Sequence, residues 1–174
     1  MATRPPVLLC LSRSRNWWAP LVCWLAQVPT NHAFVLYQDE RWGGWWALQI
    51  GPLGTQLLPA KAVMDEQRRV EAYRYVGGDP WPAMRAVSRY VGEGYDWLGL
   101  GWGMVRLAWM RLTGNKLRAW HWGRRAYCFE VLAAMLKHWQ LLGGDPADAQ
   151  PREIRGLLRS RTQFREELVP EEYR

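Results

Sequence analysis

The spacing of apolar residues changes once along the chain, at Pro80, and this change limits the fold more than any other feature. Before Pro80, the apolar runs are short and are separated by glycine, proline or polar turns, which is typical of strands. After Pro80, apolar residues recur every three or four positions, which is typical of helices that bury one face. The expected order, a strand, a helix and a meander of strands before Pro80 and then helices, predicts an α+β fold.

The predicted elements follow this division. Strands are expected at 7–12, 31–37, 45–50, 55–58 and 70–76, and helices at 19–27, 81–91 and 124–142, with a glycine-rich apolar segment at 97–110. One domain is expected over residues 1–156, followed by a charged tail at 157–174, and the last 20 residues are expected to form a short helix and this tail.

The charge and the tryptophan content both indicate a partner surface. The formal net charge is +7, which favours an anionic partner such as nucleic acid, an acidic polymer or an anionic membrane surface. The arginines occur as scattered pairs and not as one dense block, which argues against nucleic acid. The chain has 13 tryptophans in 174 residues, and because so many indoles are hard to bury in one small domain, some are expected to face a partner.

The cysteines exclude several classes of protein. Cys10, Cys23 and Cys128 are an odd number at irregular spacing, which is a poor disulfide framework. Together with the three histidines they form no ligand-spaced cluster, so no metal and no cofactor is expected. No signal peptide is visible, so the protein is expected in the cytoplasm when it is made. No run reaches 18 apolar residues, although the segment 97–110 leaves a place on a bilayer surface open.

Three residues form a candidate for nucleophilic catalysis. Cys128 stands at an expected helix start after Arg124 and Arg125, and the helix dipole and the two cations are predicted to lower the pKa of its thiol. His32, at the start of a strand, is placed to take a proton from a facing thiol. Gln49, on the next strand, is placed to hydrogen-bond the second ring nitrogen. A single cysteine and a single histidine are more often structural, so the residue types alone leave that reading open.

Five segments in the same order resemble the permuted NlpC-type hydrolases. The first segment is a strand at 7–12, a helix end at 24–25 and a strand at 30–36 that begins with His32, a small residue and an apolar residue. The second is the strand and turn at 47–54, and the third is the Gly-x-x-Tyr-Asp turn at 92–96. The fourth is the Cys-x-Glu helix start at 127–132, and the fifth is the x-Pro-x-acid-apolar sequence at 150–154. The resemblance covers about residues 7 to 154, which is most of the chain.

The resemblance implies a circularly permuted papain-like fold, in which a small antiparallel sheet packs against the nucleophile helix. It implies Cys128 as the nucleophile, His32 as the base and Gln49 as the orienting residue. Substrate-binding residues would be Tyr95, Trp97, Tyr127 and Phe129, and supporting residues would be Asn31, Asp96 and Glu130. The chain departs from the family at Gln49, where an acid is usual, and at Phe129, where a small serine is usual.

The implied activity is cleavage of amide bonds in the peptide stems of peptidoglycan, through a thioester on Cys128. Two alternatives stay open. One is a structural or binding component of a phage tail tip, carried in a virion to the cell envelope and in contact with other virion proteins through exposed tryptophans. The other is an acyltransferase or lipid (thio)esterase, which Phe129 and the apolar segment after Tyr95 favour.

Overall fold

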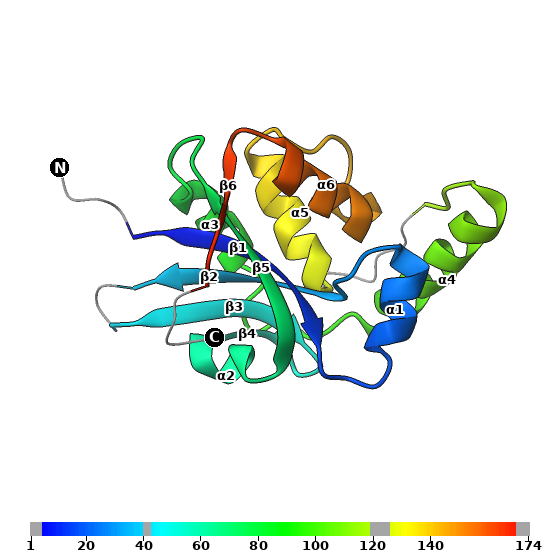
Figure 1. Cartoon of the computed structure of the whole chain (residues 1–174), viewed down its shortest axis with the longest axis horizontal. Coiled ribbons are helices and arrows are strands. Elements are labelled where there is room, and N and C mark those ends of the chain that lie inside the picture. The colour runs from blue at the N-terminus through cyan, green and yellow to red at the C-terminus, as the bar shows by residue number, and fades with distance from the viewer. Residues whose placement is uncertain (1–4, 40–42, 119–125, 170–174) are drawn as a thin grey trace.

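The computed structural model describes residues 5–39, 43–118 and 126–169, and these residues form an α+β fold with a six-stranded antiparallel sheet and six α-helices (Figure 1). The strands are β1 (Val7–Ser14), β2 (His32–Gln38), β3 (Trp45–Gly51), β4 (Gly54–Pro59), β5 (Gln67–Tyr75) and β6 (Phe164–Glu167). Their order in the sheet is β4-β3-β2-β1-β5-β6. The helices are α1 (Ala19–Ala26), α2 (Ala60–Met64), α3 (Trp81–Ser88), α4 (Trp97–Thr113), α5 (Cys128–His138) and α6 (Pro151–Ser160), with a short 3-10 helix η1 (Pro146–Asp148).

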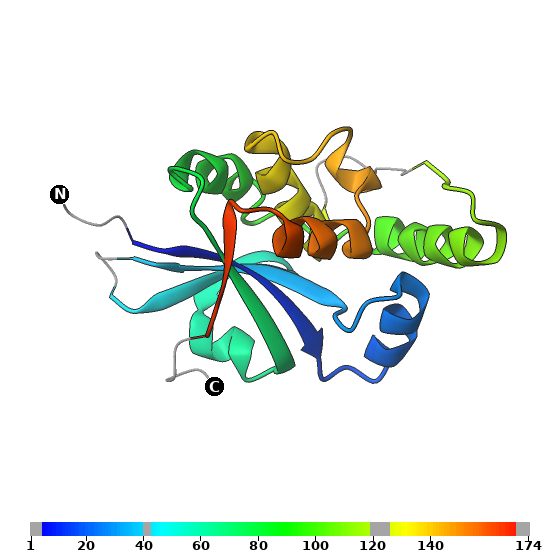
Figure 2. The ribbon, with the colours of Figure 1, turned by 45° about the horizontal axis from the view of Figure 1, so that its top comes forward.

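Helices cover both faces of the sheet. Helices α3, α5 and α6 lie on one face, and α2 lies on the other (Figure 2). In β1, Leu9 and Leu11 belong to the apolar cluster that contains α5, whereas Leu8 and Cys10 belong to the cluster that contains α2. Because both faces are covered, the first five residues of β1, 7–11, form a continuous apolar run without polar alternation.

Helix α5 is the central helix of the larger cluster. It packs on β2 and β3, and eight of its residues are buried, among them Leu132 and Leu136. The sheet therefore packs against the helix that carries Cys128 at its first position.

Helices α1 and α4 lie side by side at one end of the sheet, away from α3 (Figures 1 and 2). The segment after Tyr95 that was expected only as glycine-rich and apolar is α4, a helix of 17 residues in which Gly99 alone is buried. No helix among the described residues is long and apolar enough to span a bilayer.

The end of the described chain is more ordered than the sequence suggested. The expected charged tail at 157–174 includes the last part of α6 and all of β6. Strand β6 pairs with β5 at the edge of the sheet, and Arg74 forms an ion pair with Glu167 at 2.6 Å. Helix α6 buries Ile154 and Leu158 against the core. The boundary proposed after residue 156 thus lies within a helix that packs on the rest of the chain.

Candidate active site

Cys128 is the first residue of α5, and the residues before it are fixed by two other elements. The carboxylate of Glu130 accepts a hydrogen bond from the Tyr127 N–H at 3.0 Å, which caps the start of the helix. Tyr95 forms a bridge with Ala126, and the Asp96 N–H donates to the Ala126 carbonyl at 3.3 Å. Glu130 and Asp96 therefore hold the position of the thiol from outside the pocket lining, whereas Tyr95 both braces this segment and lines the pocket.

Burial has the largest effect on the pKa of the Cys128 thiol. Cys128 is 5% exposed, and burial raises its pKa to about 12, although the backbone N–H groups of Ala33, Phe129 and Cys128 itself lower it. The sequence predicted a lowered pKa, and this direction is wrong because the cost of burying a thiolate exceeds the help from the helix start. Arg124 and Arg125, which entered that prediction, lie outside the described residues. At neutral pH the thiol is protonated.

His32 and Gln49 form the hydrogen bond that their strands predicted. Nε2 of His32 and Oε1 of Gln49 are 3.3 Å apart. Because an amide oxygen can only accept, Nε2 donates, and Nδ1 is left as the basic nitrogen of the neutral ring. Burial lowers the pKa of His32 to about 4, against a smaller opposing effect of the Gln49 hydrogen bond. The imidazole is therefore neutral and able to act as a base above about pH 5.

Cys128 and His32 line one pocket, which they reach from different sides of the sheet. In β2, Ala33 and Val35 belong to the cluster with α5, whereas His32 stacks on Phe34 of the opposite cluster, with ring centroids 5.9 Å apart. His32 is the first residue of β2, so its ring lies at the end of the strand, where the pocket opens. Among the described residues no hydrogen bond joins the Cys128 thiol to the His32 ring, and the backbone N–H of Ala33, the next residue after His32, interacts with the sulfur.

The lowered pKa of His32 predicts a titration outside the usual histidine range. By NMR of the imidazole carbons, we expect a midpoint near pH 4, and a still lower midpoint in Gln49→Leu, because that variant loses the bond that raises the pKa. In the unfolded chain the ring titrates near 6.5, so the His32 contribution to stability falls as pH drops from 6.5 toward 4. His32→Gln assigns the signal, and a midpoint of 6.5 in the folded protein would contradict the burial of the ring.

The other predicted site residues divide into two groups. Tyr95, Trp97, Tyr127 and Phe129 line the pocket with Cys128. Phe129 is 3% exposed and Trp97 is 55% exposed, and the rings of Tyr95 and Trp97 lie 4.7 Å apart, so Trp97 forms an outer edge of the pocket.

Asn31 and Asp96 brace the site through hydrogen bonds, and Asn31 also lines the pocket. The Asn31 amide accepts from the Ser14 N–H and donates to the Ser14 hydroxyl, both at 2.9 Å, which fixes the residue before His32. Asp96 caps α4 by accepting from the Gly99 N–H at 2.7 Å. A Cβ at Gly99 would lie 2.2 Å from the Asp96 carboxylate, so this cap requires glycine.

Much of the pocket wall comes from residues that the sequence did not single out. They include Trp18, which precedes α1, Val22 of α1, and Leu100, Gly103, Met104 and Leu107 of α4. The four α4 positions follow the i, i+3, i+4, i+7 pattern, and this spacing is the signal that could have identified one side of a helix. The pocket is therefore mainly apolar around a thiol, an imidazole and an amide.

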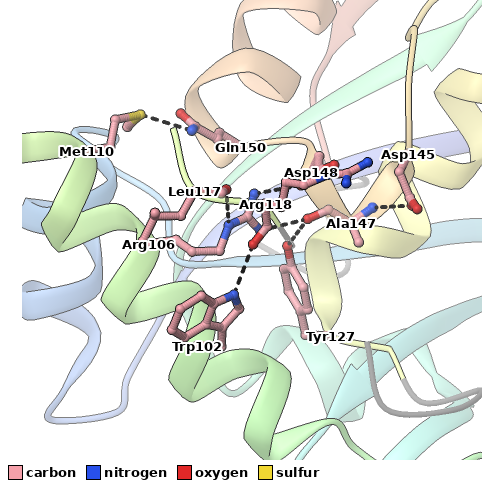
Figure 3. A network of polar contacts seen from close by, with 10 residues as sticks. All are labelled: Trp102, Arg106, Met110, Leu117, Arg118, Tyr127, Asp145, Ala147, Asp148 and Gln150. Atoms are coloured by element: carbon pink, nitrogen blue, oxygen red, sulfur yellow. Dashed lines mark hydrogen bonds and ion pairs between the residues drawn. The ribbon is translucent and has the colours of Figure 1, made fainter. Parts of the chain in front are cut away.

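Arg106 ties α4 to the segment next to the cysteine helix (Figure 3). Its guanidinium donates to the Leu117 carbonyl at 2.9 Å, to the Ala147 carbonyl at 3.0 Å and to the Asp148 carboxylate at 2.9 Å. The Tyr127 hydroxyl donates to the same Ala147 carbonyl at 3.3 Å. This network holds the wall from α4 against the residue that precedes Cys128.

The described residues contain no group of three or more histidine, cysteine or acidic side chains that could hold a metal ion. Neither the protein-family models nor the curated proteins include a match to this chain.

Proposed function

We propose that this chain is a cysteine hydrolase with a circularly permuted papain-like fold, in which Cys128 is the nucleophile and His32 the base. The observation that carries the proposal is the shared pocket of the Cys128 thiol, at the start of a buried helix, and the His32–Gln49 pair. The order strand, helix, strand with histidine, and later helix with cysteine is also the order of the resembling family.

The chemistry is acyl transfer through a thioester. The thiol proton passes to Nδ1 of His32 while the sulfur attacks the substrate carbonyl, and the imidazolium then gives that proton to the departing amine or alcohol. The N–H groups that lie beside the sulfur are placed to stabilise the oxyanion. Water hydrolyses the thioester with His32 again as the base.

The resting pair is neutral on both sides, since the pKa of Cys128 is about 12 and that of His32 about 4. A thiolate–imidazolium pair is thus strongly disfavoured before substrate binds, and proton transfer accompanies attack. Catalytic hydrogen bonds commonly shorten in the substrate complex, so binding would bring the ring to the sulfur. Gln49, a neutral amide, orients the ring and supports its charged form less than a carboxylate would.

Amide bonds of peptidoglycan stems are the first substrate class for this site, as the family resemblance implies. A second candidate is an acyl chain in ester or thioester linkage. The lining favours it, because Val22, Leu100, Met104, Leu107 and Phe129 surround the thiol with apolar surface.

Trapping of the acyl-enzyme tests the proposal. We expect that incubation with p-nitrophenyl butyrate, followed by acid quenching and peptide mass mapping, places one butyryl group on Cys128. Cys10 is fully buried and Cys23 is partly exposed, so they serve as internal controls. Parallel digestion of purified peptidoglycan and of acyl thioesters distinguishes the two substrate classes. Acylation of Cys23 alone, or of no cysteine while neither substrate is cut, would leave a structural role for the fold.

A further inference from the structure

Helix α4 presents an apolar stripe to solvent on the side away from the pocket. Its residues recur at intervals of four and three positions, so they lie along one side of the helix: Leu98, Trp102, Val105, Trp109 and Leu112. Leu98, Val105, Trp109 and Leu112 are exposed, Leu112 by 84%, whereas Trp102 is half-buried and its indole N–H donates to the Arg118 carbonyl. Four exposed apolar residues in one row are uncommon on a surface without a partner.

Helix α1 adds a second stripe beside the first. Leu21 and Trp24 of α1 and Trp17, which lies just before the helix, are exposed and have the same spacing of four and three. The guanidinium of Arg111 lies 3.9 Å from the centre of the Trp24 ring and donates to the Trp24 carbonyl, which joins the two helices. We call these eight apolar side chains the α1–α4 surface.

The charges around the α1–α4 surface are all of one sign on the two helices. Neither helix contains an acidic residue. Arg106, the cation in the middle of α4, turns inward to Leu117, Ala147 and Asp148, and so leaves the stripe uninterrupted (Figure 3).

Three exposed cations border this surface. Arg111 lies in the last turn of α4 and Lys116 follows the helix, whereas Arg118 lies beside Trp102, whose indole N–H donates to the Arg118 carbonyl at 3.0 Å. An apolar surface bordered by cations is complementary to the apolar layer beneath anionic headgroups.

We propose that the α1–α4 surface docks on an anionic phospholipid bilayer, with both helices lying in the plane of the interface. Tryptophan and leucine enter the boundary between headgroups and acyl chains, and lysine and arginine contact anionic headgroups. A second copy of the chain is a poorer occupant, because the cations of two identical surfaces would face each other. Docking does not depend on the proposed hydrolase activity.

Vesicle co-sedimentation tests the docking. We expect the full chain to bind vesicles of phosphatidylcholine with phosphatidylserine at least about tenfold more strongly than vesicles of phosphatidylcholine alone, and less strongly at high salt. Val105→Glu and Leu112→Glu should each lower the binding at least about tenfold, because a carboxylate replaces a buried apolar contact. Leu53→Glu is the matched control, since Leu53 is 85% exposed in the β3–β4 turn and should bind like the wild type.

Two readouts separate docking from folding and from catalysis. Circular dichroism and the thermal midpoint verify that each variant is folded, and Cys128→Ala should bind vesicles like the wild type. The proposal is overturned if the wild type does not bind anionic vesicles or if Leu112→Glu binds them equally well. It is also overturned if light scattering shows a wild-type dimer that Leu112→Glu dissociates, because the surface would then belong to a second copy.

Discussion

Cys128→Ala should lower kcat/KM by about 10,000-fold or more on any substrate that the wild type hydrolyses, because the thioester cannot form without the sulfur. Alanine leaves the backbone N–H groups of Ala33 and Phe129 in place, so any remaining rate reports binding and oxyanion stabilisation alone. The measurement is initial-rate hydrolysis of p-nitrophenyl butyrate and release of soluble fragments from peptidoglycan. Loss of one buried sulfur should cost about 1 kcal/mol of stability, so the fold persists.

Cys23→Ala is the matched control for this variant. Cys23 is also a free cysteine, but it lies on α1 and does not line the pocket. We expect it to retain full activity and the Cys128 adduct. If Cys128→Ala remained active while Cys23→Ala did not, the nucleophile would have been assigned to the wrong cysteine.

Gly103→Leu should lower kcat/KM for acyl substrates on the order of 10–100-fold, because its side chain would occupy the pocket. Gly103 lines the pocket from α4, and no atom lies within 4 Å of a Cβ built there, so leucine fits the backbone and extends into the open space. Leucine is also a better helix former than glycine by roughly 0.5–1 kcal/mol. Activity should therefore fall while the thermal midpoint stays constant or rises.

Gly101→Leu is the control that distinguishes an effect of filling the pocket from an effect of stabilising α4. Gly101 lies in the same helix, likewise has no atom within 4 Å of a built Cβ, and does not line the pocket. It should show the same change in stability with unchanged hydrolysis of the soluble ester. Equal losses of activity in both variants would mean that the rigidity of α4, and not the open space beside Gly103, limits turnover.

Local patterns predicted most of the elements because each is specified by its own residues. The run that begins at Val7 is apolar throughout, and the proline and glycine turns separate the later strands, so β1 to β5, α1 and α3 lie close to the expected positions. Strand β6 was not predicted, because Arg165, Glu166 and Glu167 are typical of a solvated tail. Its position depends on β5, which lies far away in the sequence.

The sequence indicated the polar residues of the candidate site, but neither the pocket wall from α1 and α4 nor the electrostatics. The context of Cys128 and His32 indicated a pair, and the structure places both at one pocket. The direction of the Cys128 pKa was wrong, because burial depends on how β2, α4 and α5 assemble. The position in the helix and the neighbouring charges can be read from the sequence, but they describe only the effects that lower the thiol pKa, and not the burial that raises it.

The position of β1 has a consequence for synthesis on the ribosome. Strand β1 emerges first but lies in the interior of the sheet, between β2, which follows soon, and β5, which follows only after β3 and β4. A nascent chain can thus build the β1–β4 meander early, while one edge of β1 stays open until β5 leaves the exit tunnel. Helix α5, which carries Cys128 at its first position, emerges later still. A translating ribosome would therefore carry a nearly complete sheet before the Cys128 thiol is added to it.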